Sequence, residues 1–256
     1  MEKQQSASKF ERRHHLTYYE CDEMGHPILS MVMSIMSEVA DIQSEKLGIN
    51  KDTIQATGGT WVIASFSGNV DLQELEIGDE VIVGTQATGY NAFFATRDFW
   101  VRSVDGTREY ARVKSLLVFM NLTTRRIEKI PESLIKAYGT PKLTKVPRGK
   151  RPTKMDSTEK VEGKEYHVRY FDLDANHHVN NARYFDWLLD PLGEQFLTTH
   201  QLTSFSIQYR HEVRAGQNID SRFQVIDGLT SRHQITSDDE LCTSAEFCWQ
   251  PLKPLN

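Results

Sequence analysis

The stretch Tyr170-Phe-Asp-Leu-Asp-Ala-Asn-His-His-Val-Asn-Asn-Ala-Arg-Tyr-Phe-Asp-Trp187 is the most informative part of this chain. It lies between an apolar strand-like run and an apolar helix-like run. Its polar side chains include Asp172, Asp174, Asn176, His177, His178, Asn180 and Asn181. Amides at the start of a helix can hold a developing negative charge, and nearby side chains can handle water and protons. Polar groups gathered at such a junction therefore indicate catalysis rather than packing.

Within this stretch Asp174, Asn176 and His178 stand at alternate positions. In an extended segment alternate side chains project to one side. A turn followed by a helix cap is the simpler interpretation, because Asx residues favour turns and Asn180 or Asn181 could be an N-cap. Capping explains part of the segment, but it does not explain why a carboxylate, an amide and an imidazole occur at alternate positions. The three residues are therefore predicted to be catalytic.

A metal site is the alternative for the His177-His178 pair with Asp172 and Asp174. Adjacent histidines usually point apart, and no CxxC or HxxxH pattern accompanies them, so neither a metal nor another cofactor is predicted. Asp172 is interpreted as a support or turn residue. The chain also lacks GxGxxG, GxxxxGK[ST] and GxSxG patterns. Their absence argues against dinucleotide and P-loop sites and against an α/β-hydrolase.

The segment resembles the active-site motif of the acyl-ACP thioesterases, which are double-hotdog enzymes. The wider Asp-x-Asn-x-His pattern recurs among hotdog thioesterases, and the resemblance runs from about His14 to Pro251. Plant-type members have a Glu-Cys pair after a downstream basic stretch. The Glu of that pair matches Glu212, and the Cys position holds Val213. The resemblance thus implies that Glu212 joins the catalytic set, and that carboxylates rather than a cysteine at this position drive hydrolysis.

A second observation is that the chain contains the same plan twice. His15 to Pro27 precedes an apolar helical pattern, and Tyr166 to His178 precedes another in which Pro191 is expected to kink or restart the helix. Several strand-like runs follow each helix; they include Ile77–Gly84 in the first copy and Ala215–Ile219 in the second. Short strands after one long helix favour an antiparallel sheet wrapped around that helix. The predicted fold class is α+β, a tandem (double) hotdog with two such sheets.

The two copies are expected to differ in chemistry. With Tyr19 aligned to Tyr170, the residues that face Asp174, Asn176 and His178 are Glu23, Gly25 and Pro27. Aligning Gly78 with Gly216 places Glu74 opposite Glu212. Only the second copy is therefore expected to be catalytic. The resemblance implies that the first copy holds the acyl chain. Candidate lining residues, for which ordinary core packing is the alternative, are Met31, Ile35, Met36 and Trp61 to Phe66.

The predicted domains are an amino-terminal acyl-binding hotdog at 1–140, a basic linker at 141–157 and a catalytic hotdog at 158–256. From Pro141 to Met155 the chain reads PKLTKVPRGKRPTKM, which contains six basic residues and no acid. Its prolines and glycine mark an extended connector. We consider both a solvated linker and a docking segment for an acidic partner.

The overall composition limits the function classes. Hydrophobic residues make up 39% and charged residues 25% of the 256 residues, as in globular proteins, and no apolar run reaches transmembrane length. The polar segment Met1–Glu11 lacks the apolar core of a signal peptide, and three cysteines without a CxxC favour a reduced cytoplasm. A net charge of −5 argues against nucleic-acid binding.

The resemblance therefore implies hydrolysis of fatty acyl-[acyl carrier protein] to free fatty acid. The expected partner is an acidic acyl carrier protein bearing an acyl-phosphopantetheine, without membrane insertion, and a homodimer is allowed. An acyl-CoA thioesterase of the same fold is the nearest alternative. A non-catalytic acyl-binding hotdog regulator is the alternative from another class. It would normally carry a DNA-binding helical segment, for which the tail before Phe10 leaves no room.

Overall fold

The computed structural model describes residues 9–156, 160–174 and 178–252 and divides into two compact units. The first unit contains the chain up to Leu16, Ser34–Phe66 and Gly78–Gly149. The second contains Thr17–Met33, Ser67–Ile77 and the chain from Lys150 onward. The second unit therefore includes two segments from the amino-terminal half. The domain boundaries expected from the sequence stay predictions.

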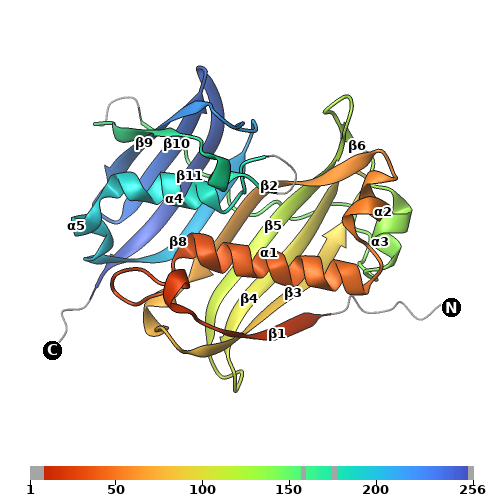
Figure 1. Ribbon diagram of the computed structural model, residues 1–256, viewed down its shortest axis with the longest axis horizontal. Coiled ribbons are helices and arrows are strands. Elements are labelled where there is room, and N and C mark those ends of the chain that lie inside the picture. Colours follow the sequence, from red (N-terminus) through yellow and green to blue (C-terminus); the bar gives the residue numbers. More distant parts are fainter. Residues whose placement is uncertain (1–8, 157–159, 175–177, 253–256) are drawn as a thin grey trace. The chain divides into compact units, whose positions relative to one another are not determined.

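The first unit is built on an antiparallel sheet with the strand order β1-β3-β4-β5-β2, and β6 pairs with β5. The helix α1 (Leu29–Lys46) crosses this sheet, as Figure 1 shows. The strands are β1 (Phe10–His15), β2 (Gly59–Val70), β3 (Glu80–Tyr90), β4 (Phe94–Ser103), β5 (Glu109–Asn121) and β6 (Ile127–Glu128). Its short helices are α2 (Lys51–Gln55) and α3 (Glu132–Lys136). Two further short helices of the amino-terminal half, η1 (Tyr18–Glu20) and η2 (Leu72–Glu74), belong to the second unit.

The packing of α1 follows its sequence pattern. Apolar side chains three and four residues apart form one buried stripe: Leu29, Val32, Met33, Met36 and Val39. A buried arginine adds a polar contact to this packing. Arg97 of β4 donates hydrogen bonds to Gln43 Oε1 of α1 and Thr85 Oγ1 of β3, at 2.5 and 3.0 Å. Burial lowers the pKa of Arg97. These bonds satisfy a guanidinium that would otherwise be costly to bury.

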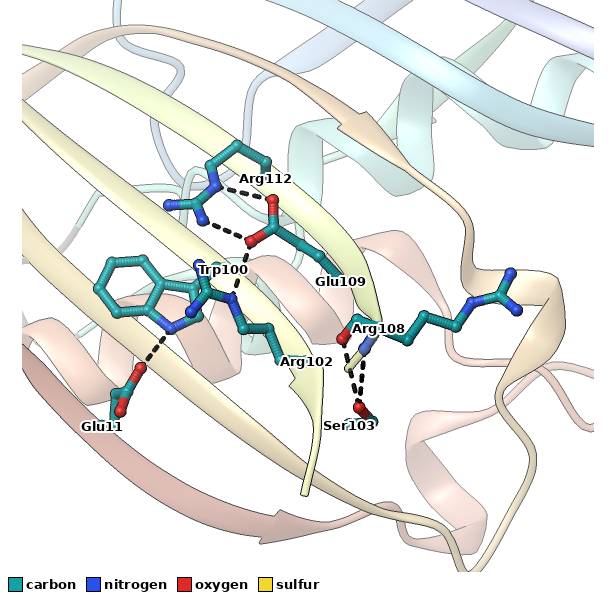
Figure 2. Close-up of polar contacts among 7 residues, drawn as sticks. All are labelled: Glu11, Trp100, Arg102, Ser103, Arg108, Glu109 and Arg112. Atoms are coloured by element: carbon teal, nitrogen blue, oxygen red, sulfur yellow. Dashed lines mark hydrogen bonds and ion pairs between the residues drawn. The ribbon is translucent and has the colours of Figure 1, made fainter. Parts of the chain in front are cut away.

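The opposite face of β4 carries Trp100, which is only 2% exposed. Figure 2 shows its ring beside the guanidinium groups of Arg102 and Arg112, at 5.4 and 5.1 Å from the ring centroid. Glu109 accepts hydrogen bonds from both arginines, and the indole N–H donates to Glu11 Oε1 at 2.8 Å. Arginine stems and cation–π contacts thus shield a large apolar ring on the face of the sheet away from α1.

The second unit repeats the plan with the strand order β8-β11-β10-β9-β7. Its helix is interrupted, because Pro191 ends α4 and opens a 3₁₀ turn, as the sequence predicted. Figure 1 shows α4 against the sheet. The strands are β7 (Glu162–His167), β8 (His200–Tyr209), β9 (Asn218–Ile226), β10 (Thr230–Ser237) and β11 (Glu240–Pro251). The helices are η3 (Tyr170–Asp172), α4 (Arg183–Leu189), η4 (Asp190–Leu192) and α5 (Glu194–Leu197).

The core of the second unit contains a buried histidine. His233 of β10 is 1% exposed, stacks on Phe223 and meets the ring of Phe247 edge-on, with centroids 5.8 and 5.0 Å away. Its Nε2 lies 2.8 Å from Ser231 Oγ, which also accepts a hydrogen bond from the Trp249 indole. Burial lowers the pKa of His233 to about 3, so the imidazole is neutral in the folded protein at neutral pH.

The α+β tandem-hotdog prediction is confirmed, with two differences in the strands. β3 and β9 begin at Glu80 and Asn218, later than the sequence pattern indicated. The residues just before each strand form a turn, in which Gly78 and Gly216 adopt φ of +95° and +77°. A positive φ is readily accessible to glycine, so these matching glycines end the turn rather than start the strand.

The linker makes contacts at both ends, although most of its residues are exposed, as expected of a solvated connector. Near its start, Leu143 N–H donates to the Tyr90 carbonyl at 2.7 Å and Val146 is buried. Farther along, Lys150 Nζ lies 2.7 Å from Glu246 Oε1, and Glu246 is only 5% exposed. Burial raises the pKa of Glu246, but hydrogen bonds from Lys150 and Thr153 outweigh it and hold the pKa below its ordinary value. Each end of the linker is therefore attached to the unit to which it belongs.

Candidate active site

The motif loop begins at a buried carboxylate. Asp172, at the end of η3, is 1% exposed and accepts hydrogen bonds from the backbone and guanidinium of Arg169, each at 2.8 Å. Burial raises the pKa of Asp172, but the Arg169 bonds outweigh it and leave the pKa lowered. The Asp172 carbonyl accepts the Asn180 N–H at 2.9 Å. Asp172 thus holds both ends of the loop, which confirms its interpretation as a support residue.

The loop closes on itself between Asp174 and His178. Asp174 N–H donates to the His178 carbonyl at 2.8 Å, and His178 N–H lies 3.4 Å from Asp174 Oδ1. A bridge between Leu173 and Val179 continues this pairing. The Asp174 carboxylate therefore shapes the loop that presents His178. Asn176, the third predicted member of the set, lies outside the described residues.

The structure brings Glu212 to this loop from a distant part of the chain. Glu212 Oε2 lies 3.6 Å from His178 Nε2, and the two side chains are 33% and 37% exposed. Water can therefore reach both groups. Contacts between catalytic groups are often long in a site without substrate and shorten in the complex. Of the predicted set, Asp174, His178 and Glu212 are thus assembled at one place.

Two tyrosines bond to the backbone of the motif and of the residue after Glu212, and the sequence analysis missed both. The N–H of Val213 donates to Tyr184 Oη at 3.3 Å, and Tyr209 Oη donates to the Asn181 carbonyl at 2.9 Å. The two tyrosine rings meet edge-on with centroids 5.3 Å apart. Burial raises the pKa of both hydroxyls, which keeps them neutral at neutral pH. Their signal was weak, because an aromatic residue in a strand or helix usually indicates core packing.

The described part of the site contains no activated thiol. Val213, at the position of the plant cysteine, is fully buried, so a side chain here points away from the solvent-accessible Glu212. Cys242 is also buried, and burial raises the pKa of its thiol. A raised thiol pKa disfavours the thiolate, which is the nucleophilic form. Among the described groups the carboxylates and the imidazole remain as proton acceptors.

The residues just before α4 help to hold the motif loop together. Asn180 N–H is bonded to Asp172, as described above, and α4 begins only at Arg183. The Asn180 side chain accepts the Ala182 N–H at 2.9 Å. Because its N–H is bonded to the Asp172 carbonyl, the Asn180 amide is already used inside the loop.

The register assumed between the two copies is wrong. Asp22 N–H donates to the His26 carbonyl at 2.8 Å, as Asp174 N–H does to His178, and Ile28 N–H donates to Glu20 as Asn180 N–H does to Asp172. The bridge between Cys21 and Pro27 repeats that between Leu173 and Val179. The residues that face Asp174 and His178 are therefore Asp22 and His26, not Glu23 and Pro27. Aligning Tyr18, instead of Tyr19, with Tyr170 reproduces this register.

Two further features of the described ranges concern ligands and membranes. No group of three or more potential metal-ligating His, Cys, Asp or Glu residues occurs among the described residues. Across the same ranges, no helix combines the length and apolar character that spanning a membrane would require.

Comparison with known proteins identifies two matching families. Residues 7–138 match the acyl-ACP thioesterase N-terminal domain, and residues 155–251 match the acyl-ACP thioesterase C-terminal domain. A curated relative is the chloroplastic dodecanoyl-[acyl-carrier-protein] hydrolase of Cinnamomum camphora, which is 36% identical over 52% of this chain and 36% of its own length. The chain spans less than two thirds of the length of this relative and of the palmitoyl-acyl carrier protein thioesterase of Gossypium hirsutum.

Solved structures agree along nearly the whole chain. A protein from Lactobacillus plantarum, provisionally described as an oleoyl thioesterase, is 34% identical with a TM-score of 0.94. The alignment covers 98% of this chain and 99% of that one. The 12:0-ACP thioesterase from Umbellularia californica is 25% identical with a TM-score of 0.83, over 95% of this chain and 98% of its own.

Proposed function

The chain belongs to the acyl-ACP thioesterase family, and from this premise we propose that it hydrolyses fatty acyl-[acyl carrier protein] to free fatty acid in fatty acid biosynthesis. The observation that carries the proposal is the contact between His178 and Glu212 at a loop that a buried Asp172 holds in place. Such an arrangement supplies a water-accessible base next to an imidazole. The curated relatives named above act on acyl carrier proteins.

In the proposed mechanism, Glu212 is the general base that takes a proton from water while the water oxygen attacks the thioester carbonyl carbon. His178 hydrogen-bonds with Glu212 and passes the proton on to the departing sulfur. Thiols have a pKa of about 8.5, so the thiolate leaves readily and needs little general-acid help. Asp174 supports the loop that presents His178, and Asn176 keeps its proposed role of positioning the thioester or the water.

Hydrolysis in water labelled with ¹⁸O distinguishes attack by water on the thioester from attack by the Asp174 carboxylate. Hydrogen bonding of Asp174 within the loop favours a supporting role, so we expect a single turnover in H₂¹⁸O to place ¹⁸O in the fatty acid and none in the protein. Mass spectrometry of the product and of the peptide that contains Asp174 measures both. Heavy oxygen in the Asp174 carboxylate would instead establish an acyl-anhydride intermediate and contradict the proposed role of Glu212.

The carrier protein is proposed as the partner over coenzyme A because the linker is basic and acyl carrier proteins are acidic. Lys142 and Lys145 have exposed side chains, whereas Lys150 is paired with the buried Glu246. We therefore place the docking charges at Lys142 and Lys145 rather than at Lys150. Opposite charges speed association, and salt screens that effect.

Purified protein should hydrolyse acyl-ACP with a higher kcat/KM than the matched acyl-CoA, and this kcat/KM should fall as ionic strength rises. Replacing both Lys142 and Lys145 with Ser should lower it further. Each exposed charge contributes about 1 kcal/mol or less, which limits the loss to about fivefold per residue. Initial rates at low and moderate salt measure these effects.

The matched control is Lys129→Ser with Lys136→Ser, which removes the same charge from exposed positions outside the linker. Short acyl-pantetheine thioesters, which have no protein surface, should be insensitive to both double variants. An equal loss in the two double variants would mean that only net charge matters, and docking would then belong to other basic residues such as Arg183 or Arg210. Hydrolysis of acyl-CoA but not of acyl-ACP would favour the acyl-CoA thioesterase. No turnover of any thioester would favour an acyl-binding regulator.

The roles of the two halves and the location are also proposals. The first copy is proposed to hold the acyl chain against α1, where Met36 and Ile35 are buried and Trp61 packs with Phe119 at 5.5 Å between ring centroids. The second copy is proposed to carry the main chemistry. A cytoplasmic location is proposed from the cysteine content, and a homodimer is compatible with the fold.

A further inference from the structure

The first copy of the motif retains more of the catalytic set than its sequence indicates. With the register given by the backbone hydrogen bonds, Asp22 and His26 occupy the positions of Asp174 and His178. The turns after η2 and β8 correspond as well, because Gly78 N–H bonds to the Leu16 carbonyl and Gly216 N–H to that of Val168. This match places Glu74 at the position of Glu212, and Leu75 and Val213, the residues that follow these glutamates, are both buried.

His26 is held in a definite orientation. Its Nδ1 lies 3.0 Å from the carbonyl oxygen of Leu75. A carbonyl can only accept, so Nδ1 carries the proton and Nε2 keeps its lone pair in the neutral ring. His26 is partly exposed. The contact also joins the motif loop to the residue after Glu74.

The carboxylate of Asp22 makes a shorter hydrogen bond to its histidine's N–H than Asp174 makes to that of His178. Asp22 Oδ1 accepts the N–H groups of Met24 and His26 at 2.9 and 3.0 Å, compared with 3.4 Å between Asp174 Oδ1 and the His178 N–H. A preorganised loop loses no orientation when a substrate binds. The first copy therefore presents a fixed imidazole, as a general base requires.

The surroundings of the two motifs differ in charge and polarity. Positions that carry Arg169, Arg210 and Arg214 in the second copy carry Thr17, Leu72 and Glu76 in the first. Met24 stands in place of Asn176. Two exposed apolar side chains, Met24 and Ile77, accompany the first motif, and each is 45% exposed. An anionic carrier or coenzyme would be disfavoured here, whereas an uncharged apolar thioester would not.

We propose that Asp22, His26 and Glu74 form a second, slower thioester-hydrolysing site that accepts uncharged acyl thioesters. The inference rests on the proposed hydrolysis at the second copy. His26 Nε2 removes a proton from water, the water oxygen bonds to the thioester carbon, and the carbon–sulfur bond breaks. The thiolate leaves and takes up the proton, so the products are the carboxylic acid and the thiol. The missing counterpart of Asn176 accounts for the lower rate.

The test uses the full chain with the second copy disabled by His178→Ala and Glu212→Ala. Hexanoyl-N-acetylcysteamine, an uncharged thioester, should still be hydrolysed above the buffer blank, whereas hexanoyl-ACP should not. Adding His26→Ala should lower the residual rate at least tenfold, because loss of a general base costs about 10²–10⁴-fold. Free imidazole should restore part of that rate, which a merely structural role of His26 would not allow.

Two control variants separate loss of the base from loss of charge or of fold. Glu23→Gln removes an exposed charge beside the motif, at the position of Ala175, and should leave the residual rate unchanged. His26→Gln keeps a donor for the Leu75 carbonyl but supplies no base, so it should be as slow as His26→Ala and melt at the temperature of the parent. It thus replaces His26→Ala if that variant does not fold.

The outcomes separate the two proposals. A wild-type protein that hydrolyses acyl-ACP, together with a residual rate that is absent or does not depend on His26, overturns the second site alone. A wild-type protein that hydrolyses no thioester overturns the proposed function, and the second site with it. A His26-dependent residual rate that imidazole restores supports the second site.

Discussion

Replacing Glu212 or His178 with alanine should lower kcat for acyl-ACP about 10²–10⁴-fold while leaving KM within a few-fold of wild type. The two groups face each other at 3.6 Å, and the proposed proton path runs from water through Glu212 and His178 to the departing sulfur. Removing either one interrupts that path. Steady-state kinetics with acyl-ACP, together with thermal unfolding of each variant, measures the effect apart from any loss of fold.

Asp174→Ala and Asn176→Ala should also lower turnover, as members of the predicted catalytic set. Because Asp174 bonds to the His178 backbone, Asp174→Asn, which keeps an acceptor for that N–H, should retain more activity than Asp174→Ala. Glu23→Ala is the matched control, since Glu23 faces Ala175 and no catalytic position. Near-normal turnover in both Glu212→Ala and His178→Ala would refute the site assignment.

The second large effect is acid destabilisation through His233. The pKa of this buried imidazole is about 3 in the folded protein, against about 6.5 for an exposed histidine. Between these values the unfolded chain binds a proton that the folded protein does not. The free energy of unfolding should therefore fall as pH decreases, by about 1.4 kcal/mol per pH unit from this group alone. The stability from the neutral ring is fully present above pH 6.5 and is lost towards pH 3.

His233→Gln tests this contribution, because glutamine can still bond to Ser231 but does not titrate. Urea unfolding of wild type and variant at several pH values between 7 and 4 gives the two slopes. The variant should have the shallower dependence on pH, by about one proton per molecule. Identical slopes would mean that His233 titrates alike in both states, contrary to its burial between Phe223 and Phe247.

Short-range patterns predicted the elements well. The apolar stripe of α1 and the break at Pro191 were read correctly because both depend on neighbours within one or two helical turns. The loop at Asp172 is likewise a local structure. The starts of β3 and β9 were misplaced because each strand directly follows a turn. The sequence pattern does not mark the residue at which the turn ends and the strand begins.

Contacts between distant residues decided the rest. The sequence motif and the resemblance named Asp174, His178 and Glu212, but only the tertiary structure brings Glu212 to His178, through Tyr184 bonded to the Val213 backbone. Lys150 lies in a basic run and stays exposed, but the tertiary structure also places the buried Glu246 of β11 beside it.

What the sequence alone determined was the repeated helix-and-sheet plan, the candidate chemical groups and the family resemblance. These follow from the spacing of residues along the chain, which sets local conformation and the faces that must be buried. The register between the copies, which makes Asp22 and His26 the counterparts of Asp174 and His178, emerged only from the folded backbone. The repeated backbone hydrogen bonds select this register, in which Tyr18 aligns with Tyr170 and the Asp and His residues of the two copies match.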